Sequence, residues 1–239
     1  MTRAAALFSG LDKEYEAVFR FGAETDTLDT EGEIIATADI PAIAVIREAA
    51  RAFSGEISQV PPVYSAVKVQ GKRAYRQARD GRPPDIPVRT VAVHSFEILS
   101  WEEPDLTVRI NCSKGTYIRS LARDLGLTAG SRAYCVSLRR TGIGPFSVGS
   151  AVPAALCEPD AAISPVAAFR SLGIAAVAVG NEAAAALRAG VPLARICGLP
   201  TPDADMICWT DESGDAAALT KRAEGHWSYV IVFDRTKPR

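Results

Sequence analysis

The residue types best suited to chemistry lie together between Cys112 and Arg119, in the order Cys-Ser-Lys-Gly-Thr-Tyr-Ile-Arg. An alternating apolar run before this segment predicts a strand, and the segment then leads through Gly115 into a predicted helix. The N-terminus of a helix offers free backbone N–H groups and the positive end of the helix dipole, which favour an anion. Tyr117 and Arg119, with Lys114 beside them, would add an aromatic ring and two cations, a combination that binds an unstacked base. The alternative is structural, with Tyr117 as a half-buried anchor and Arg119 as a solvated helix residue.

Three other segments place polar and basic residues in distinctive patterns. The first runs from Gly10 to Ala17 and continues into a loop over 22–32 that is rich in Thr and Asp. The second, 59–75, contains Pro-Pro-x-Tyr-Ser-Ala-x-Lys, and the third, 138–146, begins with Leu-Arg-Arg-Thr. In the loop over 22–32 we expect Asp26 and Asp29 to make local turn hydrogen bonds.

Charge is segregated along the chain, although the formal net charge is only -1. Residues 64–89 contain seven Lys or Arg against two Asp, and residues 109–140 contain seven against one Asp. Such blocks are typical of a phosphate-contacting face on a protein that is neutral overall. A solvated surface remains the alternative interpretation.

The cysteines and histidines do not predict a metal site or a disulfide framework. The five cysteines are odd in number and form no C-x-x-C pair, and the two histidines are widely separated. Cys112 follows an apolar alternation, which favours an inert buried thiol. No run of eighteen apolar residues and no signal-peptide pattern is present, so we expect a cytoplasmic protein without a membrane span.

Hydrophobic periodicity predicts a mixture of strands and helices. Strands are expected at 15–21, 33–37, 67–69, 90–100, 105–112, 134–139, 144–148, 174–179 and 227–233; helices at 41–53, 74–79, 116–127 and 181–188. In the helix over 116–127, apolar residues would face inward, with Arg119 and Arg123 outward. The composition changes after Pro153, which favours a main domain over 1–150, a linker or helix over 151–170 and a small β-rich domain over 171–239. The fold class expected is α+β.

Read together, the four segments resemble the TruB family of bacterial-type tRNA pseudouridine synthases in order, spacing and identity. The resemblance runs from about residue 2 to about residue 146 and is most specific in Y-S-A-x-K, C-S-K-G-T-Y-I-R and L-R-R-T. It implies a pseudouridine synthase catalytic domain, with a largely antiparallel sheet and flanking helices, that is incomplete at its N-terminus. The C-terminal domain occupies the position of a small PUA-like module, and the resemblance leaves its RNA role open.

The resemblance implies isomerisation of the uridine in the TΨC loop of tRNA to pseudouridine. In the family a catalytic aspartate attacks the flipped nucleotide, and the base detaches, rotates and rejoins through carbon. This chemistry implies no cofactor and no metal. The implied partner is the T arm of tRNA, bound by a monomer.

The family motif also implies roles for individual residues. Tyr15 matches a tyrosine that packs against the flipped base and serves in proton transfer, and Arg119 matches the arginine that pairs with the catalytic aspartate. Tyr117 matches a tyrosine that contacts the target nucleotide, and Leu138 a leucine that lines the pocket. The candidate phosphate contacts are Lys68, Lys72, Arg73, Lys114, Arg139 and Arg140.

The family's nucleophile lies in a motif G-x-L-D-P-x-A-x-G, upstream of the D-K-x-Y segment. Here D-K-x-Y occupies Asp12 to Tyr15, so that motif is expected before Met1. Asp12 lacks the following proline and belongs to a different segment, and Asp26 and Asp29 align elsewhere. We therefore expect the chain as written to be inactive. The alternative from another functional class is an RNA-binding protein without catalysis.

Overall fold

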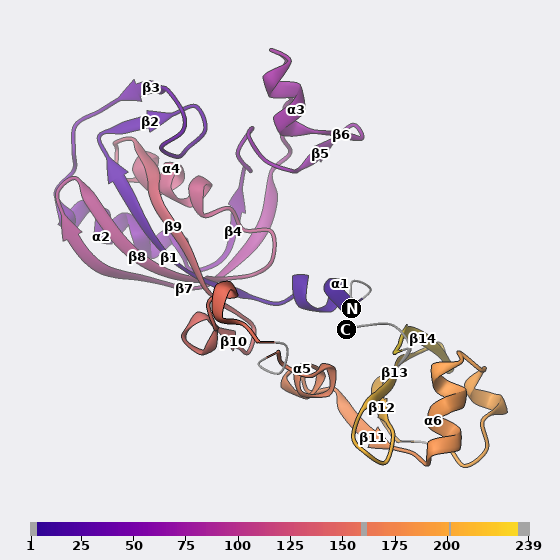
Figure 1. Cartoon of the computed structure of the whole chain (residues 1–239). Coiled ribbons are helices and arrows are strands. Elements are labelled where there is room, and N and C mark those ends of the chain that lie inside the picture. The colour runs from indigo at the N-terminus through magenta and orange to yellow at the C-terminus, as the bar shows by residue number, and fades with distance from the viewer. Residues whose placement is uncertain (1–3, 159–161, 201, 234–239) are drawn as a thin grey trace. The chain divides into compact units, whose positions relative to one another are not determined.

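The computed structural model describes residues 4–158, 162–200 and 202–233. Their contacts divide the chain into two compact units. The larger unit is Gly10–Gly149, and the smaller one joins Met1–Ser9 to Ser150–Arg239. The expected α+β class is confirmed, with antiparallel pairing dominant and helices flanking the sheets (Figure 1).

A six-stranded antiparallel sheet forms the centre of the larger unit, in the order β10-β9-β1-β8-β7-β4. Its strands are β1 (Lys13–Phe21), β4 (Gly55–Gln59), β7 (Arg89–Glu102), β8 (Asp105–Cys112), β9 (Ala133–Ile143) and β10 (Phe146–Ser147). Alternate residues of β8 are buried, namely Leu106, Val108, Ile110 and Cys112. This period of two is the pattern of a strand with one face in the core.

Two helices cover one face of this sheet (Figure 1). They are α2 (Ile43–Ala50), which continues into a 3-10 turn (Arg51–Phe53), and α4 (Ile118–Thr128). In α4 the residues Ile118, Leu121 and Leu125 recur at helical spacing and are at most 3% exposed, so they fix the helix against the sheet. Gly126 permits a close approach to β9, because a Cβ there would collide with the backbone of Ala133.

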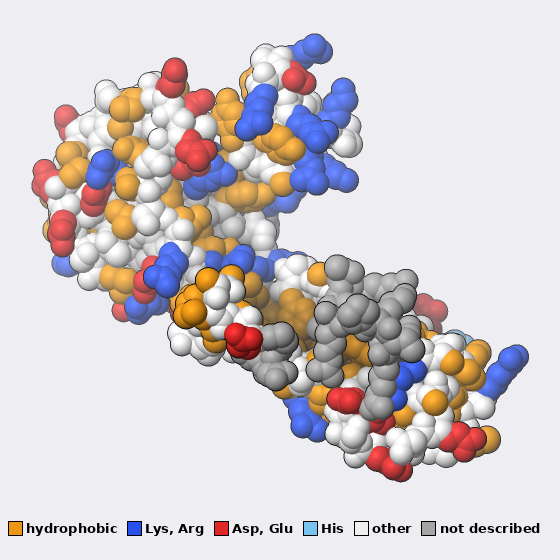
Figure 2. All heavy atoms as spheres, viewed as in Figure 1, with side chains coloured by type: hydrophobic (Ala, Val, Ile, Leu, Met, Phe, Trp, Pro, Cys, Tyr) orange, Lys and Arg blue, Asp and Glu red, His pale blue; other side chains and the backbone are white. Residues whose placement is uncertain are grey.

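Two hairpins project from the central layers. One consists of β2 (Ala23–Thr25) and β3 (Ile34–Thr37); the other consists of β5 (Lys68–Val69) and β6 (Lys72–Arg73) and leads into α3 (Ala74–Arg79). We refer to residues 68–82 as the arm. The arm carries six Lys or Arg against Asp80 alone, and Figure 2 shows blue side chains gathered over it.

The smaller unit is built on a four-stranded sheet in the order β11-β12-β13-β14, in which only β11 and β12 run parallel. Its elements are α1 (Ala5–Ser9), 3-10 turns at Ala154–Leu156 and Leu193–Arg195, α5 (Pro165–Ser171), β11 (Ala175–Ala178), α6 (Asn181–Arg188), β12 (Met206–Thr210), β13 (Ala216–Ala223) and β14 (His226–Val232). Another 3-10 turn, Val148–Ser150, spans the boundary in sequence between the two units. Phe169 of α5 is fully buried and stacks with Phe8 of α1. Helix α1 therefore packs against α5 within the smaller unit. Within the described ranges, no helix has both the length and the apolar character that crossing a membrane requires.

Most of the expected elements are confirmed within a few residues, including the strands at 15–21 and 105–112 and the helices at 74–79 and 181–188. Strand β4 is absent from the expected elements. Gly55, with φ of 87°, ends the turn after α2 and also begins β4, which pairs with β7 from Gly55 to Gln59. Ile57 is the one strongly apolar residue of β4, so its sequence gives no strand signal.

Thiol reactivity should distinguish two classes of cysteine. Cys112, Cys135 and Cys208 are buried, and burial raises the pKa of Cys135 to about 12 and that of Cys208 to about 11. Cys157 and Cys197 are exposed. Since the thiolate is the reactive form, a water-soluble disulfide reagent should modify only these two thiols in the native protein at neutral pH. Unfolding in guanidinium chloride should make the other three thiols reactive. Rapid modification of a third thiol in the native protein would contradict this assignment.

Candidate active site

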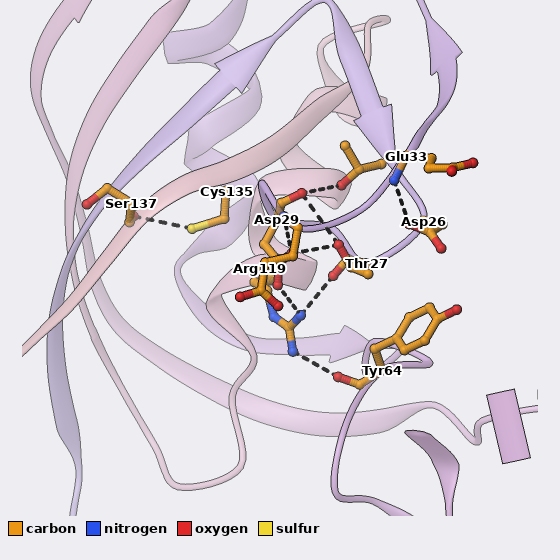
Figure 3. A network of polar contacts seen from close by, with 10 residues as sticks. Asp26, Thr27, Asp29, Glu33, Tyr64, Arg119, Cys135 and Ser137 are labelled. Carbon is orange, nitrogen blue, oxygen red and sulfur yellow. Dashed lines mark hydrogen bonds and ion pairs between the residues drawn. The ribbon is translucent and has the colours of Figure 1, made fainter. Parts of the chain in front are cut away.

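Arg119 stands at the centre of a polar network that joins three segments far apart in the sequence (Figure 3). Its guanidinium donates to Asp29 Oδ2 at 2.5 Å, to the carbonyl oxygen of Thr27 at 2.8 Å and to the carbonyl oxygen of Tyr64 at 2.9 Å. The Arg119 and Asp29 side chains are 23% and 26% exposed, respectively. A partly covered ion pair with further hydrogen bonds holds both side chains in a fixed orientation.

The turn that carries Asp29 is held by its own side chains. Asp29 Oδ1 accepts hydrogen bonds from the Thr27 hydroxyl at 2.6 Å and from the Glu31 N–H at 3.1 Å. Asp26 Oδ1 likewise accepts from the Glu33 N–H at 3.0 Å, so the expected local turn bonds are confirmed. Nothing in the neighbouring sequence indicates that Asp29 also binds Arg119, because that partner lies ninety positions away.

Leu28, at the tip of this turn, adopts a left-handed backbone with φ of 61°. A non-glycine residue pays a conformational cost of roughly 1–2 kcal/mol in that region. Burial of its side chain and a hydrogen bond from the Cys135 N–H to its carbonyl oxygen, at 3.0 Å, hold it there. The turn is therefore fixed against β9, and Asp29 forms a bridge with Cys135 of that strand.

The segment between β4 and the arm lies along the first turns of α4. Ser120 Oγ donates to the carbonyl oxygen of Val60 at 2.8 Å, and Arg123 donates to the same oxygen at 3.0 Å. The expectation that Arg119 and Arg123 point outward is correct only with respect to the hydrophobic core. The segment covers both, leaving the Arg123 side chain 18% exposed. The interpretation of Arg119 as a solvated helix residue is therefore wrong.

Tyr15 and Leu138 lie on neighbouring strands of the sheet. Tyr15 of β1 is opposite Arg140 of β9, and Leu138, which is 47% exposed, is opposite Ala17. Burial raises the pKa of Tyr15, the nearby Cys112 thiol adds to the rise, and Arg140 opposes it. Tyr15 is therefore a neutral phenol at physiological pH.

Tyr117 is the N-cap residue of α4, and its ring packs against the apolar base of the arm. This base consists of Val67, Ala74 and Ile86, with Val63 and Val69 beside them. The ring is thus partly buried, as the structural alternative for Tyr117 predicts. Whether it also contacts a nucleotide stays a prediction.

The candidate phosphate contacts lie in three places of the larger unit and are all exposed: Lys68, Lys72 and Arg73 on the arm, Lys114 before α4, and Arg139 and Arg140 on β9. The arm also contains Tyr75, which has Arg76 and Arg79 over its ring at 5.9 and 5.8 Å. The Arg76 guanidinium lowers the pKa of Tyr75. Among the described residues, no group of three or more metal-ligating side chains occurs.

A double-mutant cycle should measure the central ion pair. Arg119→Met and Asp29→Asn are each expected to lower the free energy of unfolding, and their combined effect should fall short of the sum by about 1–3 kcal/mol. Arg20→Met is the control. Arg20 lies on β1, five positions after Tyr15, and forms its own two-bond ion pair with Asp105, outside the network of Arg119. Purely additive effects of the first two changes in denaturant unfolding would contradict the assigned pair.

The ionisation of Tyr15 should be visible in an ultraviolet titration. Because its folded-state pKa lies above the unfolded value, Tyr15 contributes stability that is complete at neutral pH and is lost as the pH rises through the folded value. Tyr15→Phe should remove a late-titrating phenol and make the alkaline loss of stability shallower. Loss of a phenol that titrates at or below the ordinary value would refute this expectation.

Comparison with known proteins extends these observations. Residues 1–118 match the family model "TruB family pseudouridylate synthase (N terminal domain)". Two similar curated proteins are named tRNA pseudouridine synthase B. That of Aromatoleum aromaticum is 48% identical over 152 residues, covering 63% of this chain and 49% of the relative. That of Leifsonia xyli subsp. xyli is 45% identical over 173 residues, covering 69% and 57%. The chain thus spans about half the length of the curated relatives it matches.

Solved structures support the same fold. A chain of the crystal structure of a Cbf5-Nop10-Gar1 complex matches with a TM-score of 0.61 at 23% identity, covering 98% of this chain and 71% of that one. A chain of an H/ACA RNP bound to a substrate RNA containing 2'-deoxyuridine matches with a TM-score of 0.59 at 22% identity, covering 100% and 70%. At these identities the likeness concerns the fold alone, whereas the family model and the curated relatives concern the sequence itself. On that evidence the chain belongs to the TruB family of pseudouridylate synthases.

Proposed function

We propose that the site serves the isomerisation of a uridine in the TΨC loop of tRNA to pseudouridine. The observation that carries the proposal is the network of Arg119, a cation fixed between the Asp29 turn and the carbonyl of Tyr64 on the same sheet face as Tyr15 and Leu138. In this reaction the bond from C1' to N1 of uracil breaks and a bond from C1' to C5 forms, while the C5 proton is lost and N1 gains one. The product is an isomer, so the reaction consumes no cofactor.

The side chains of the site have distinct roles in this proposal. Tyr15, Tyr117 and Leu138 hold the flipped base, and Arg119 orients a carboxylate. Tyr15 is a neutral phenol whose hydroxyl can donate a hydrogen bond or a proton, and burial raises its pKa. No metal is assigned to the site.

The arm supplies the affinity for RNA in this proposal. Lys68, Lys72 and Arg73 are exposed, and a cluster of basic side chains releases counterions when it neutralises phosphates. Lys114, Arg139 and Arg140 contribute further phosphate contacts. We place the binding on the T arm of tRNA, by a cytoplasmic monomer, with the C-terminal unit as a further RNA contact.

A second function, RNA binding without catalysis, is favoured by one observation. The carboxylate that faces Arg119 is that of Asp29, and both of its oxygens are occupied, one by Arg119 and the other by the Thr27 hydroxyl and the Glu31 N–H. A carboxylate held in this way is poorly placed to attack a nucleotide. The 239-residue chain is therefore expected to bind RNA without completing the isomerisation.

Binding to a T-arm hairpin tests the tRNA proposal. The chain should bind this hairpin about tenfold more tightly than a hairpin of scrambled loop sequence, and the affinity should fall as salt rises. Lys72→Ala should weaken both complexes similarly, because a phosphate contact carries no sequence information. Equal affinity for the two hairpins would overturn the assignment to the T arm.

Release of tritium from C5-labelled uridine in the same hairpin separates the two functions. The 239-residue chain should bind the labelled hairpin without releasing tritium. Release at a rate that Arg119→Met abolishes would establish the enzyme and refute the argument from the occupied Asp29. Binding without release would favour the RNA-binding function for this chain.

A further inference from the structure

The buried amide of Gln59 pairs with a single peptide group at the start of α4. Gln59 is the last residue of β4 and is 1% exposed. Its Oε1 accepts a hydrogen bond from the Tyr117 N–H at 2.8 Å, and its Nε2 donates to the Tyr117 carbonyl oxygen at 3.1 Å. Both ends of the amide are therefore used on one residue, as in the pairing of two strands.

Tyr117 depends on this partner for its geometry. It is the N-cap of α4, with an extended backbone at φ of -103° and ψ of 108°, and no side chain caps the helix there. Its carbonyl oxygen already accepts from the Leu121 N–H at 3.1 Å, so Gln59 adds a second donor and satisfies the N–H as well. Without Gln59 a part-buried peptide N–H would lose its partner, which costs free energy.

The peptide group of Tyr117 lies between the base of the arm and Arg119. On one side, the Tyr117 ring packs against Val67, Ala74 and Ile86 at the base of the arm. On the other side, Arg119 follows two positions later and reaches Asp29 and Tyr64. A shift of this peptide would therefore move the basic arm and the Arg119 guanidinium together.

Neighbouring contacts extend the same attachment by one residue. The carbonyl oxygen of Val60, next to Gln59, accepts from both Ser120 and Arg123 of α4. Gln59 and Val60 together thus bind the first turns of α4 before the chain enters the arm. The arm is consequently anchored to the helix that carries Arg119.

We propose that Gln59 is a positioning residue for RNA, which holds the Tyr117 peptide so that the arm and Arg119 engage one RNA molecule at the same time. This inference rests on the proposed function and adds a residue to it. Gln59 itself is buried and would not touch RNA; it acts through Tyr117.

The test compares Gln59→Leu with Ser131→Ala in the full chain. Leucine fills a similar volume and removes both hydrogen bonds. Ser131 is also buried and bonds a carbonyl, that of Asp39 at 2.7 Å, but it lies outside the network of Arg119. The affinity for the T-arm hairpin should fall about tenfold in Gln59→Leu and stay unchanged in Ser131→Ala.

Amide hydrogen exchange gives a readout that a loss of general stability would not mimic. In protein labelled with ¹⁵N-tyrosine, the Tyr117 amide should lose protection in Gln59→Leu, while Tyr134 in β9 and Tyr229 in β14 keep theirs. A folded Gln59→Leu that binds the hairpin as the unaltered chain does, with the Tyr117 amide exchanging freely, would overturn the proposal.

Two further outcomes keep the test decisive. If Gln59→Leu is too unstable for measurement, Ser120→Ala removes one of the two hydrogen bonds to Val60 and introduces a residue well suited to a helix. It should weaken binding in the same direction but less, and unchanged affinity would then count against Gln59. Failure of the unaltered chain to bind the hairpin would overturn the proposed function instead, so the two failures can be distinguished.

Discussion

The pairing of Arg119 with Asp29 and with two backbone carbonyls is the interaction on which the geometry of the site depends. The Thr27–Asp29 turn and the residues around Tyr64 are irregular segments, and neither has a sheet or helix ladder to fix it. A guanidinium presents several N–H donors in one plane, so one side chain can hold both segments at once. An ammonium group at the same position could not reproduce this arrangement, because its donors are not planar.

The position of Arg119 follows in turn from the apolar face of α4. Ile118, Leu121 and Leu125 are buried against the sheet, and this burial fixes the rotation of the helix about its axis. Arg119 then falls on the flank that faces the Asp29 turn, and Arg123 follows one turn later on the same flank. The precision of the polar network is therefore set by hydrophobic packing, which involves no charge that protons could titrate or salt could screen.

The same dependence explains how far the sequence could predict the molecule. Alternation in β8 and helical spacing in α4 are local patterns, and both elements are confirmed near their expected limits. The partner of Arg119 is not a local property: Asp29 has a complete set of turn hydrogen bonds, and nothing in its neighbours indicates a second role. The role of Gln59 is likewise not predictable from the sequence. A single glutamine at the end of a short strand, shortly before two prolines, carries no periodic signal.

Two kinds of cation can be separated by what surrounds them. Arg119 is neutralised by Asp29 and committed to backbone carbonyls, so it adds little to the long-range attraction of phosphates. Lys68, Lys72 and Arg73 of the arm are exposed, and none of them forms an ion pair with another described residue. In the proposed function, the arm therefore attracts the RNA and Arg119 serves orientation at the base. A chain with a net charge of -1 can bind RNA under this division, because the field that an approaching phosphate meets is local.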